Sequence, residues 1–257
     1  MQGNNLIQWP TAKYWTTQWN PVIGCKPCSP ACANCYAEAW AKRFKQSFEP
    51  HSTKQYKPPR KGVVFCGNIT DLFGDWMWPW CQGSQFIHAS PAHLIGACCM
   101  RKGDAKYLWL TKRAEAMTEV LRWAEAILGI SRNSDNQYFG FTAENQEWYD
   151  KRMATVTEGA FPDWANLWLS CEPLLGPINL KLDNANVSKR LKQVIVGCES
   201  GKNRRTCEIQ WIREIVRQCM KFNVPVFVKQ ICLPNGKFTS QIEAFPSDIR
   251  VRQLVWG

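Results

Sequence analysis

The sequence has no apolar run long enough to span a membrane, no Gly- or Ser-rich linker, no low-complexity tract and no internal repeat. A spanning helix needs about 20 mostly apolar residues, so the missing run argues against a membrane protein. The first ten residues also lack the basic start and apolar middle of a secretory signal. Without an export signal, we expect the thirteen cysteines to be mostly reduced and the protein to be cytoplasmic.

The length and composition suit one large domain. The chain has 257 residues, and 45% of them are hydrophobic, which is enough to bury a substantial core. Because no linker divides the chain, we predict a single domain over residues 1–257. Short apolar runs alternate with helical patterns, which is typical of repeated β-α units. We therefore predict an α/β fold, a full or partial TIM-type (β/α) barrel with mostly parallel strands. The predicted strands cover residues 19–23, 63–67, 107–110, 138–141, 167–170, 193–196 and 224–228, and the helices 36–48, 112–128, 146–157 and 209–222.

Four cysteines lie within eleven residues, on a segment interrupted by two prolines: Cys25, Cys28, Cys32 and Cys35. Thiolates this close in sequence can converge on one metal centre. The last three have the spacing C-x3-C-x2-C, with Tyr36 directly after them. Cys25, Cys32 and Cys35 form an alternative set with the spacing C-x6-C-x2-C. The residues alone leave open which of Cys25 and Cys28 is a third ligand.

The C-x3-C-x2-C spacing followed by an aromatic residue resembles the cluster loop of radical S-adenosylmethionine enzymes. The resemblance implies a 4Fe–4S cluster held by three cysteines, with one iron free to chelate S-adenosylmethionine. An open coordination position serves catalysis in the same way at zinc sites. The cofactor would supply a 5′-deoxyadenosyl radical, and the protein would direct it at a substrate. An external electron donor such as a flavodoxin or ferredoxin is then expected.

Other uses of the four thiols remain open. Cys25 with Cys28, and Cys32 with Cys35, each read C-x2-C, so the four could form a structural zinc site. Zinc ribbons usually separate their two pairs by a long hairpin, whereas these pairs nearly touch, which disfavours zinc. Reactive thiols or a disulfide are the remaining alternative.

Polar residues follow most of the predicted strands. The carboxyl ends of barrel strands build the active site, so we expect these residues to line one site. The glutamates among them could accept hydrogen bonds from ribose hydroxyls or from the methionine amino group, and the lysines and the glutamine could meet a carboxylate or a phosphate. Any single one could instead be a helix cap or part of a loop salt bridge. The candidate cofactor-binding residues are Tyr36, Asp71, Lys112, Glu144, Glu172, Glu199, Lys229 and Gln230.

The formal net charge is +11, and the basic residues are clustered at 42–45, 57–61, 189–192 and 202–205. Such an excess attracts polyanions and speeds their association. Fourteen tryptophans add potential stacking surfaces for unpaired bases. The alternative is a solvated basic surface over a tryptophan-rich core. The composition favours DNA, RNA or a nucleotide as substrate, without establishing it.

Several blocks together resemble a family of phage and prophage proteins, the gp-thirty-seven/gp-sixty-eight or three-cysteine-motif proteins. The resemblance implies a compact radical S-adenosylmethionine barrel. The recurring cysteines of that family correspond to Cys25, Cys32 and Cys35, so Cys28 is an addition in this chain. The chain also has Ala31 and Cys198 where that family usually has glycine. The matching blocks are residues 19–25, 29–37, 70–73, 110–113, 170–178, 197–201 and 226–230.

These observations together predict a radical S-adenosylmethionine enzyme that modifies or repairs a nucleic-acid base or nucleotide. A base within a duplex would have to be flipped out to reach the reacting carbon. Radical modification of a peptide or protein is a second hypothesis. It is disfavoured because the chain after Cys232 has no additional cysteine-rich segment. A zinc-stabilised nucleic-acid-binding module without catalysis is a third, disfavoured because carboxylates around a site repel phosphate.

Overall fold

The computed structural model describes residues 7–77, 90–130, 135–159, 161–201 and 203–256. The chain forms two compact units, each assembled from segments distant in sequence. We call residues 15–141 and 151–166 the cysteine-loop unit. Residues 1–14, 142–150 and 167–257 form the carboxylate unit. Each unit is described by itself below.

The cysteine-loop unit contains parallel strands in the order β2-β5-β6-β7. Parallel strands covered by helices are rich in buried apolar residues, and every residue of β5 and β7 is buried. A short antiparallel pair, β3–β4, lies between β2 and β5 in the sequence. The strands are β2 (Thr17–Trp19), β3 (Val22–Ile23), β4 (His51–Ser52), β5 (Val63–Cys66), β6 (Lys106–Thr111) and β7 (Gln137–Thr142).

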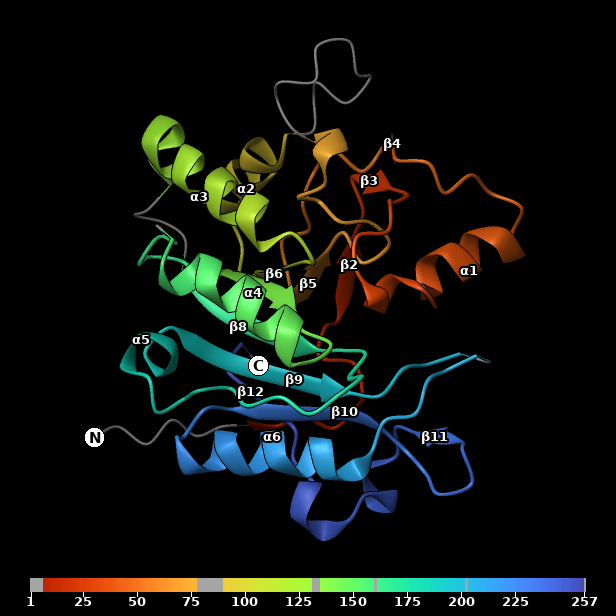
Figure 1. Ribbon diagram of the computed structural model, residues 1–257. Coiled ribbons are helices and arrows are strands. Elements are labelled where there is room, and N and C mark those ends of the chain that lie inside the picture. The colour runs from red at the N-terminus through yellow and green to blue at the C-terminus, as the bar shows by residue number, and fades with distance from the viewer. Residues whose placement is uncertain (1–6, 78–89, 131–134, 160, 202, 257) are drawn as a thin grey trace. The chain divides into compact units, whose positions relative to one another are not determined.

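The helices of this unit connect its strands. The longest, α3, buries Met117, Leu121 and Ala124 on one face, as the period of an outer helix requires. It ends at Gly129, which has a φ of 60° that glycine adopts without strain. Figure 1 shows α2 beside α3, with α1 on the other side of the unit. The helices are α1 (Tyr36–Arg43), α2 (Pro91–Cys99), α3 (Ala114–Leu128) and the 3-10 turns Pro30–Cys32 and Asp75–Met77; α4 (Gln146–Thr157) begins in the carboxylate unit.

The carboxylate unit contains three parallel strands, β8, β9 and β10, and β11 pairs antiparallel with β10. Helix α6 packs on β9 and β10 through Ile212, Ile215 and Cys219, which recur with helical spacing. β1 and β12 form a separate antiparallel pair. The elements are β1 (Ile7–Gln8), β8 (Asn166–Cys171), α5 (Ala185–Ser188), β9 (Leu191–Gly197), α6 (Ile209–Lys221), β10 (Val226–Cys232), β11 (Phe238–Thr239), β12 (Gln253–Leu254) and the 3-10 turns Ile242–Ala244 and Ser247–Ile249.

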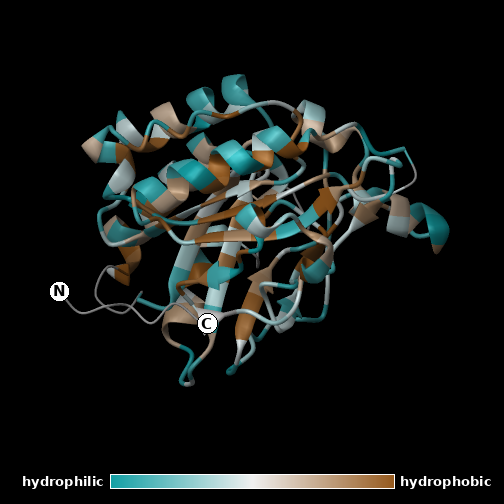
Figure 2. Ribbon diagram, turned by 90° about the horizontal axis from the view of Figure 1, so that it is seen from below, coloured by the Kyte–Doolittle hydropathy of each residue, from teal (hydrophilic) through white to brown (hydrophobic). Residues whose placement is uncertain are grey.

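Five of the twelve tryptophans in the described ranges are buried in the core: Trp19, Trp76, Trp109, Trp168 and Trp256. Trp109 stacks on Phe139 at 6.2 Å and meets Trp19 edge to face in the cysteine-loop unit. Trp168 meets Trp256 edge to face in the carboxylate unit. Figure 2 shows brown, hydrophobic segments in several strands, and helices that carry both hydrophobic and hydrophilic residues. Aromatic packing of this kind contributes to stability beyond the area that it buries.

The predicted α/β character and mostly parallel strands are confirmed. The first predicted strand is divided into β2 and β3 at Pro21, which has no backbone N–H to donate. The predicted helix 36–48 ends early, at Arg43, because Lys45 adopts a left-handed φ of 53°. Within the described ranges no helix has the length and apolar character needed to cross a bilayer. Closure into a barrel and the single domain stay predictions.

Candidate functional site

The cysteine loop begins at a backbone position that only glycine suits. Gly24 has a φ of 89°, and a Cβ there would lie 2.5 Å from the carbonyl oxygen of Glu49. Thr70 Oγ1 donates to the Gly24 carbonyl at 2.6 Å, and the Cys25 N–H donates to the Phe48 carbonyl at 3.1 Å. The start of the loop is therefore fixed by the segment before β4 and by the loop after β5.

The rest of the loop turns tightly into α1. The N–H of Cys32 donates to the Ser29 carbonyl, and the N–H of Cys35 donates to the Cys32 carbonyl. Cys35 is the residue that precedes the first turn of α1. All four loop cysteines are half-buried, so their sulfurs are neither sealed in the core nor fully in water. The local turns thus gather the thiols at one end of a helix.

Three of the loop cysteines have shifted pKa values, and they shift in different directions. A hydrogen bond from the Cys28 thiol, assisted by the Lys112 ammonium, lowers the pKa of Cys32 to about 4. The same hydrogen bond, together with burial, raises the pKa of Cys28 well above its ordinary value. Burial and the nearby Asp71 carboxylate raise the pKa of Cys25 to about 11. Of Cys25, Cys28 and Cys32, the thiolate form is most favoured at Cys32, because its neighbours donate a hydrogen bond and supply positive charge.

Asp71 holds the residues beneath the loop. Its Oδ1 accepts hydrogen bonds from the Phe73 N–H at 3.0 Å and from Thr111 Oγ1 at 2.7 Å. Its Oδ2 accepts from the Lys112 N–H at 3.1 Å and from the Arg113 guanidinium at 3.0 Å. A buried carboxylate with four donors is well satisfied. Asp71 therefore positions Lys112 and Arg113 at the end of β6.

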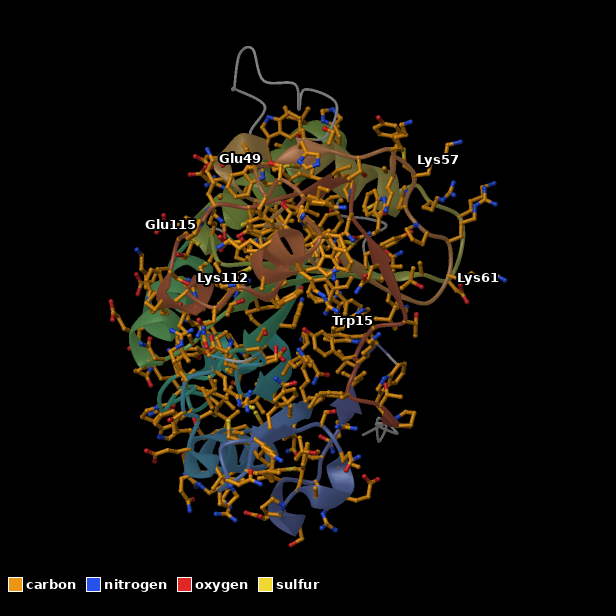
Figure 3. All side chains as sticks on the ribbon, turned by 90° about the vertical axis from the view of Figure 1, so that its right-hand side faces the viewer. Trp15, Glu49, Lys57, Lys61, Lys112 and Glu115 are labelled. Atoms are coloured by element: carbon orange, nitrogen blue, oxygen red, sulfur yellow. The ribbon has the colours of Figure 1, made fainter. Side chains whose placement is uncertain are left out.

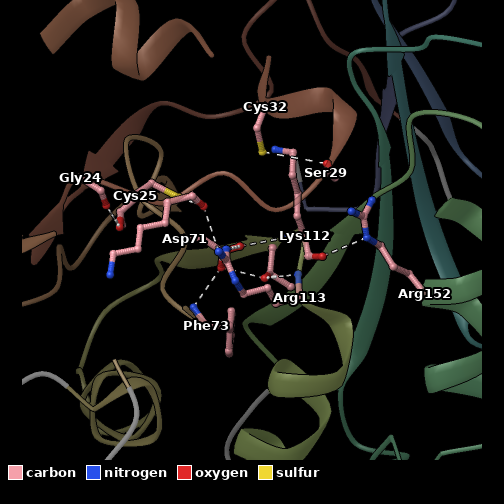
Figure 4. Close-up of polar contacts among 12 residues, drawn as sticks. Gly24, Cys25, Ser29, Cys32, Asp71, Phe73, Lys112, Arg113 and Arg152 are labelled. Carbon is pink, nitrogen blue, oxygen red and sulfur yellow. Dashed lines mark hydrogen bonds and ion pairs between the residues drawn. The ribbon is translucent and has the colours of Figure 1, made fainter. Parts of the chain in front are cut away.

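Figure 4 shows how Lys112 and Arg113 lie relative to the cysteine loop. The Lys112 side chain points toward Cys32, and its carbonyl accepts a hydrogen bond from Arg152 Nε at 3.0 Å. Arg113 Nη2 donates to the Lys26 carbonyl at 2.9 Å, and its guanidinium lies 4.9 Å from the ring centre of Trp76. Two consecutive basic residues thus approach the loop, one near a sulfur and the other at the backbone.

The donor set of the loop suits a thiolate-ligated centre. Four half-buried thiols on one loop, one of them with a lowered pKa, are the ligand chemistry of iron–sulfur and zinc sites. In the described part of the chain, no three His, Cys, Asp or Glu side chains are already placed to hold a metal ion. The Cys28–Cys32 hydrogen bond brings two sulfurs together.

A second group of predicted residues lies in the carboxylate unit, around Glu172. Lys229 Nζ lies 2.7 Å from Glu172 Oε1 and 5.9 Å from the ring centre of Tyr14. Glu172 Oε2 accepts hydrogen bonds from Tyr14 Oη and from Ser170 Oγ, both at 3.2 Å. Lys229 and Gln230 were expected after a strand, but they lie inside β10. The register with β9 shifts between Val228 and Gln230, and such a bulge re-aims a side chain.

The other predicted carboxylates of this unit are mainly bound by protein groups. Glu199 accepts hydrogen bonds from the Arg205 guanidinium at 2.5 and 3.1 Å and from its N–H at 2.8 Å. That interaction, with a contribution from the Glu144 carboxylate, raises the pKa of Arg205. Glu144 is fully buried two residues after β7. Gln230 Nε2 donates to the Cys198 carbonyl at 2.6 Å.

The predicted site residues therefore divide between the units. The cysteine-loop unit brings together the four cysteines, Asp71 and Lys112. Tyr36 begins α1, and its hydroxyl donates to the Asn68 carbonyl. The carboxylate unit brings Glu172 to Lys229, whereas Glu199 and Gln230 have protein partners of their own. Cofactor binding by these residues stays a prediction.

Three residues were missed. Arg113 stands next to Lys112 in the sequence, so the polar end of β6 carried a signal for it. Arg205 belongs to a basic cluster that was interpreted only as surface charge. Tyr14 carried no signal, because its partner Glu172 is 158 positions away.

One family model matches most of the chain. A family model described as a protein of unknown function, DUF5131, matches residues 7–243. No curated protein and no solved structure matches the chain significantly. The matched span includes the cysteine loop, the Asp71–Lys112–Arg113 group and the Glu172–Lys229 pair. The resemblance to the phage three-cysteine-motif proteins stays a prediction. The chain belongs to the DUF5131 family of proteins of unknown function.

Proposed function

We propose that the protein is a radical S-adenosylmethionine enzyme that modifies or repairs a nucleic-acid base or a nucleotide. The observation that carries the proposal is the cysteine loop, an anchored backbone that presents four half-buried thiols next to Lys112. The proposal includes the finer fold expectation, a full or partial TIM-type barrel within one domain. It also includes a cytoplasmic location and an external electron donor.

Cys32 and Cys35, with Cys25 or Cys28, would hold a 4Fe–4S cluster. When bound with S-adenosylmethionine, the cluster supplies the one-electron reduction that yields a 5′-deoxyadenosyl radical. Lys112 favours the thiolate form of Cys32, the form in which cysteine binds iron. Thr70 and Arg113 hold the start of the loop through the carbonyls of Gly24 and Lys26. The protein's part is therefore to preorganise ligands and to keep the loop in place.

The carboxylate unit offers polar groups suited to a cofactor or substrate. Glu172 is a carboxylate held in one orientation by Tyr14, Ser170 and Lys229. A carboxylate fixed in this way can accept hydrogen bonds from an amino group or from ribose hydroxyls without a further ordering cost. Lys229, which is partly exposed, can attract a carboxylate or phosphate.

The test begins with metal analysis of protein purified without oxygen. Iron and sulfide in amounts expected for one cluster support the proposal, whereas stoichiometric zinc with no iron supports the non-catalytic module. Reduced, cluster-loaded protein should then convert S-adenosylmethionine to 5′-deoxyadenosine. A full cluster without that product would overturn the enzymatic proposal. Cleavage stimulated by a protein and unaffected by DNA, RNA and nucleotides would favour the peptide-modifying alternative.

A further inference from the structure

Helix α1 carries three large aromatic side chains on its exposed face. Tyr36, Trp40 and Phe44 are spaced four residues apart, and 56%, 44% and 54% of each is exposed. Residues four apart on a helix lie on the same face, about 6 Å apart along the axis. We call these three residues the aromatic stripe. The helix buries only Ala37 and Ala41, so the stripe does not face the core of its unit.

The geometry of the aromatic stripe suits stacking. The rings of Trp40 and Phe44 lie 5.1 Å apart, with an angle of 49° between their planes. The guanidinium of Arg43 lies 5.8 Å from the ring centre of Phe44. Aromatic side chains usually bury most of their surface, and an exposed cluster marks a site of interaction. The stripe thus combines flat apolar faces with a cation.

The segment around the aromatic stripe is strongly basic. Residues 24–62 contain eight lysines and arginines against two glutamates, so they hold +6 of the formal net charge of +11. Four of the five exposed aromatic side chains among the described residues also lie here, the fourth being Tyr56. Figure 3 shows Lys57 and Lys61 extending outward from this segment. Residues 24–62 therefore combine a positive charge with most of the exposed aromatic side chains of the described residues.

We propose that the aromatic stripe and the basic residues around it bind a single-stranded nucleic acid. The inference rests on the proposed function and narrows its substrate class to an unpaired strand. Aromatic side chains stack on bases of any sequence, and a basic groove follows the phosphates. A duplex hides the faces of its bases, so it could use only the charges. An acidic partner protein would fit the charge but would have no need of three flat rings in a row.

The position of the stripe supports this role. Helix α1 starts directly after Cys35, the last of the four cysteines, and Tyr36 is its first residue. A strand stacked on Trp40 and Phe44 would therefore lie along a helix that begins at the proposed cluster loop. A substrate-binding surface near the reacting centre keeps the target base within reach.

Fluorescence anisotropy with labelled oligonucleotides of about 16 nucleotides, the upper end of a single site, tests the proposal. Single-stranded RNA, single-stranded DNA and a duplex of the same sequence form the three arms. The wild-type protein should bind at least one single strand more tightly than the duplex. Trp40→Ala and Phe44→Ala should each weaken that binding roughly tenfold to a hundredfold. Arg43→Gln should lower the slope of log affinity against log salt by about 0.7.

The matched controls are Ile127→Ala and Arg122→Gln, both exposed on α3, away from the stripe in sequence. They should leave affinity and salt slope at wild-type values. Circular dichroism of every variant shows whether its fold is kept. The proposal is overturned if no single strand binds, if the duplex binds equally well, or if Trp40→Ala binds like the controls. A change in sedimentation of Trp40→Ala, with unchanged binding, would make the stripe a contact between copies and would also overturn it.

The outcome is distinguishable from failure of the enzymatic proposal. Oligonucleotide binding is measured on the same reconstituted protein as the production of 5′-deoxyadenosine without nucleic acid. Binding that depends on the stripe, without any 5′-deoxyadenosine from fully loaded protein, retains the single-strand surface and rejects the radical chemistry. Production of 5′-deoxyadenosine without any strand binding retains the radical chemistry and rejects the single-strand surface.

Discussion

Arg113 forms an ion pair with Asp71 in which Nη1 lies 3.0 Å from Oδ2. The second guanidinium nitrogen donates to the Lys26 carbonyl inside the cysteine loop. Because both side chains are mostly buried, the pair is a structural link rather than a surface contact. It joins the loop after β5, the end of β6 and the cysteine loop. The position of the four thiols thus depends on residues far from them in the sequence.

Breaking this link should destabilise the protein and loosen the loop. In Asp71→Asn, Arg113 loses its anion, and one oxygen is replaced by an amide that cannot accept from Lys112 and Arg113. We expect the free energy of unfolding to fall by about 3 kcal/mol. Arg113→Lys keeps a charge but cannot reach both partners at once, so it should retain less iron per chain. Urea unfolding and iron analysis measure these effects, with Arg122→Gln as the control. A urea midpoint of Asp71→Asn equal to that of the wild type would show that the ion pair contributes nothing to the free energy of unfolding.

Single replacements by serine should show which of the four loop cysteines are needed to bind the proposed cluster. Cys32→Ser and Cys35→Ser should both abolish cluster binding, because these two belong to either ligand set. Only one of Cys25→Ser and Cys28→Ser should do so, and that one identifies the third ligand. Iron and sulfide assays after reconstitution, with Cys99→Ser on α2 as control, provide the measurement. Retention of a full cluster by Cys32→Ser would contradict the assignment of the loop.

The Glu172–Lys229 pair should show a large coupling energy. Lys229→Met leaves a mostly buried carboxylate without its cation, and we expect a cost of about 3 kcal/mol. Glu172→Gln can still accept hydrogen bonds from Tyr14 and Ser170, so its cost should be smaller. A double-mutant cycle from urea unfolding should give a coupling above about 1 kcal/mol. A coupling near zero would mean that the two charges act independently.

Alternating patterns made the fold partly predictable from the sequence. The parallel strands β5 to β10 were expected within a few residues because each contains a short apolar run, such as residues 194–196 of β9. The short antiparallel strands β1, β4, β11 and β12 were not expected. Helix α2 was missed because it is buried nearly all round, which leaves no polar face to mark a helical period. The bulge in β10 was missed as well, since nothing in the run 226–232 marks an extra residue.

The sequence indicated the candidate ligands of the proposed site but not the residues that hold the cysteine loop in place. The cysteines and Lys112 are marked by spacing and by their place after a strand. The link from Arg113 to Lys26 joins residues 87 positions apart, and no local pattern reports such a contact. Asp71 was expected to be a candidate cofactor-binding residue, but its side chain is bound by protein groups. Its carboxylate has four protein donors, a fact that depends on how β5 and β6 are brought together.

Buried thiols should make the protein sensitive to alkaline pH. Burial raises the pKa of Cys207 to about 12, and it raises those of Cys171 and Cys219 well above the ordinary value. In the unfolded chain these thiols lose their protons above about pH 8.5, whereas the folded chain keeps them. The unfolded state then binds fewer protons, so stability is fully present below about pH 8.5 and falls as pH rises. Each such thiol should cost about 1.4 kcal/mol per pH unit until its folded pKa is reached.

The variant Cys207→Ala tests this explanation directly. It removes one titrating group, so its free energy of unfolding should fall less steeply with pH, by about 1.4 kcal/mol per unit above about pH 9. Urea unfolding at several pH values between about 8 and about 10.5 gives the slopes, with Ile127→Ala as a control of unchanged slope. Cys207 is only 3% exposed, and this burial disfavours its thiolate in the folded protein. Parallel slopes for wild type and Cys207→Ala would show that this thiol titrates in the folded protein as it does in the unfolded chain.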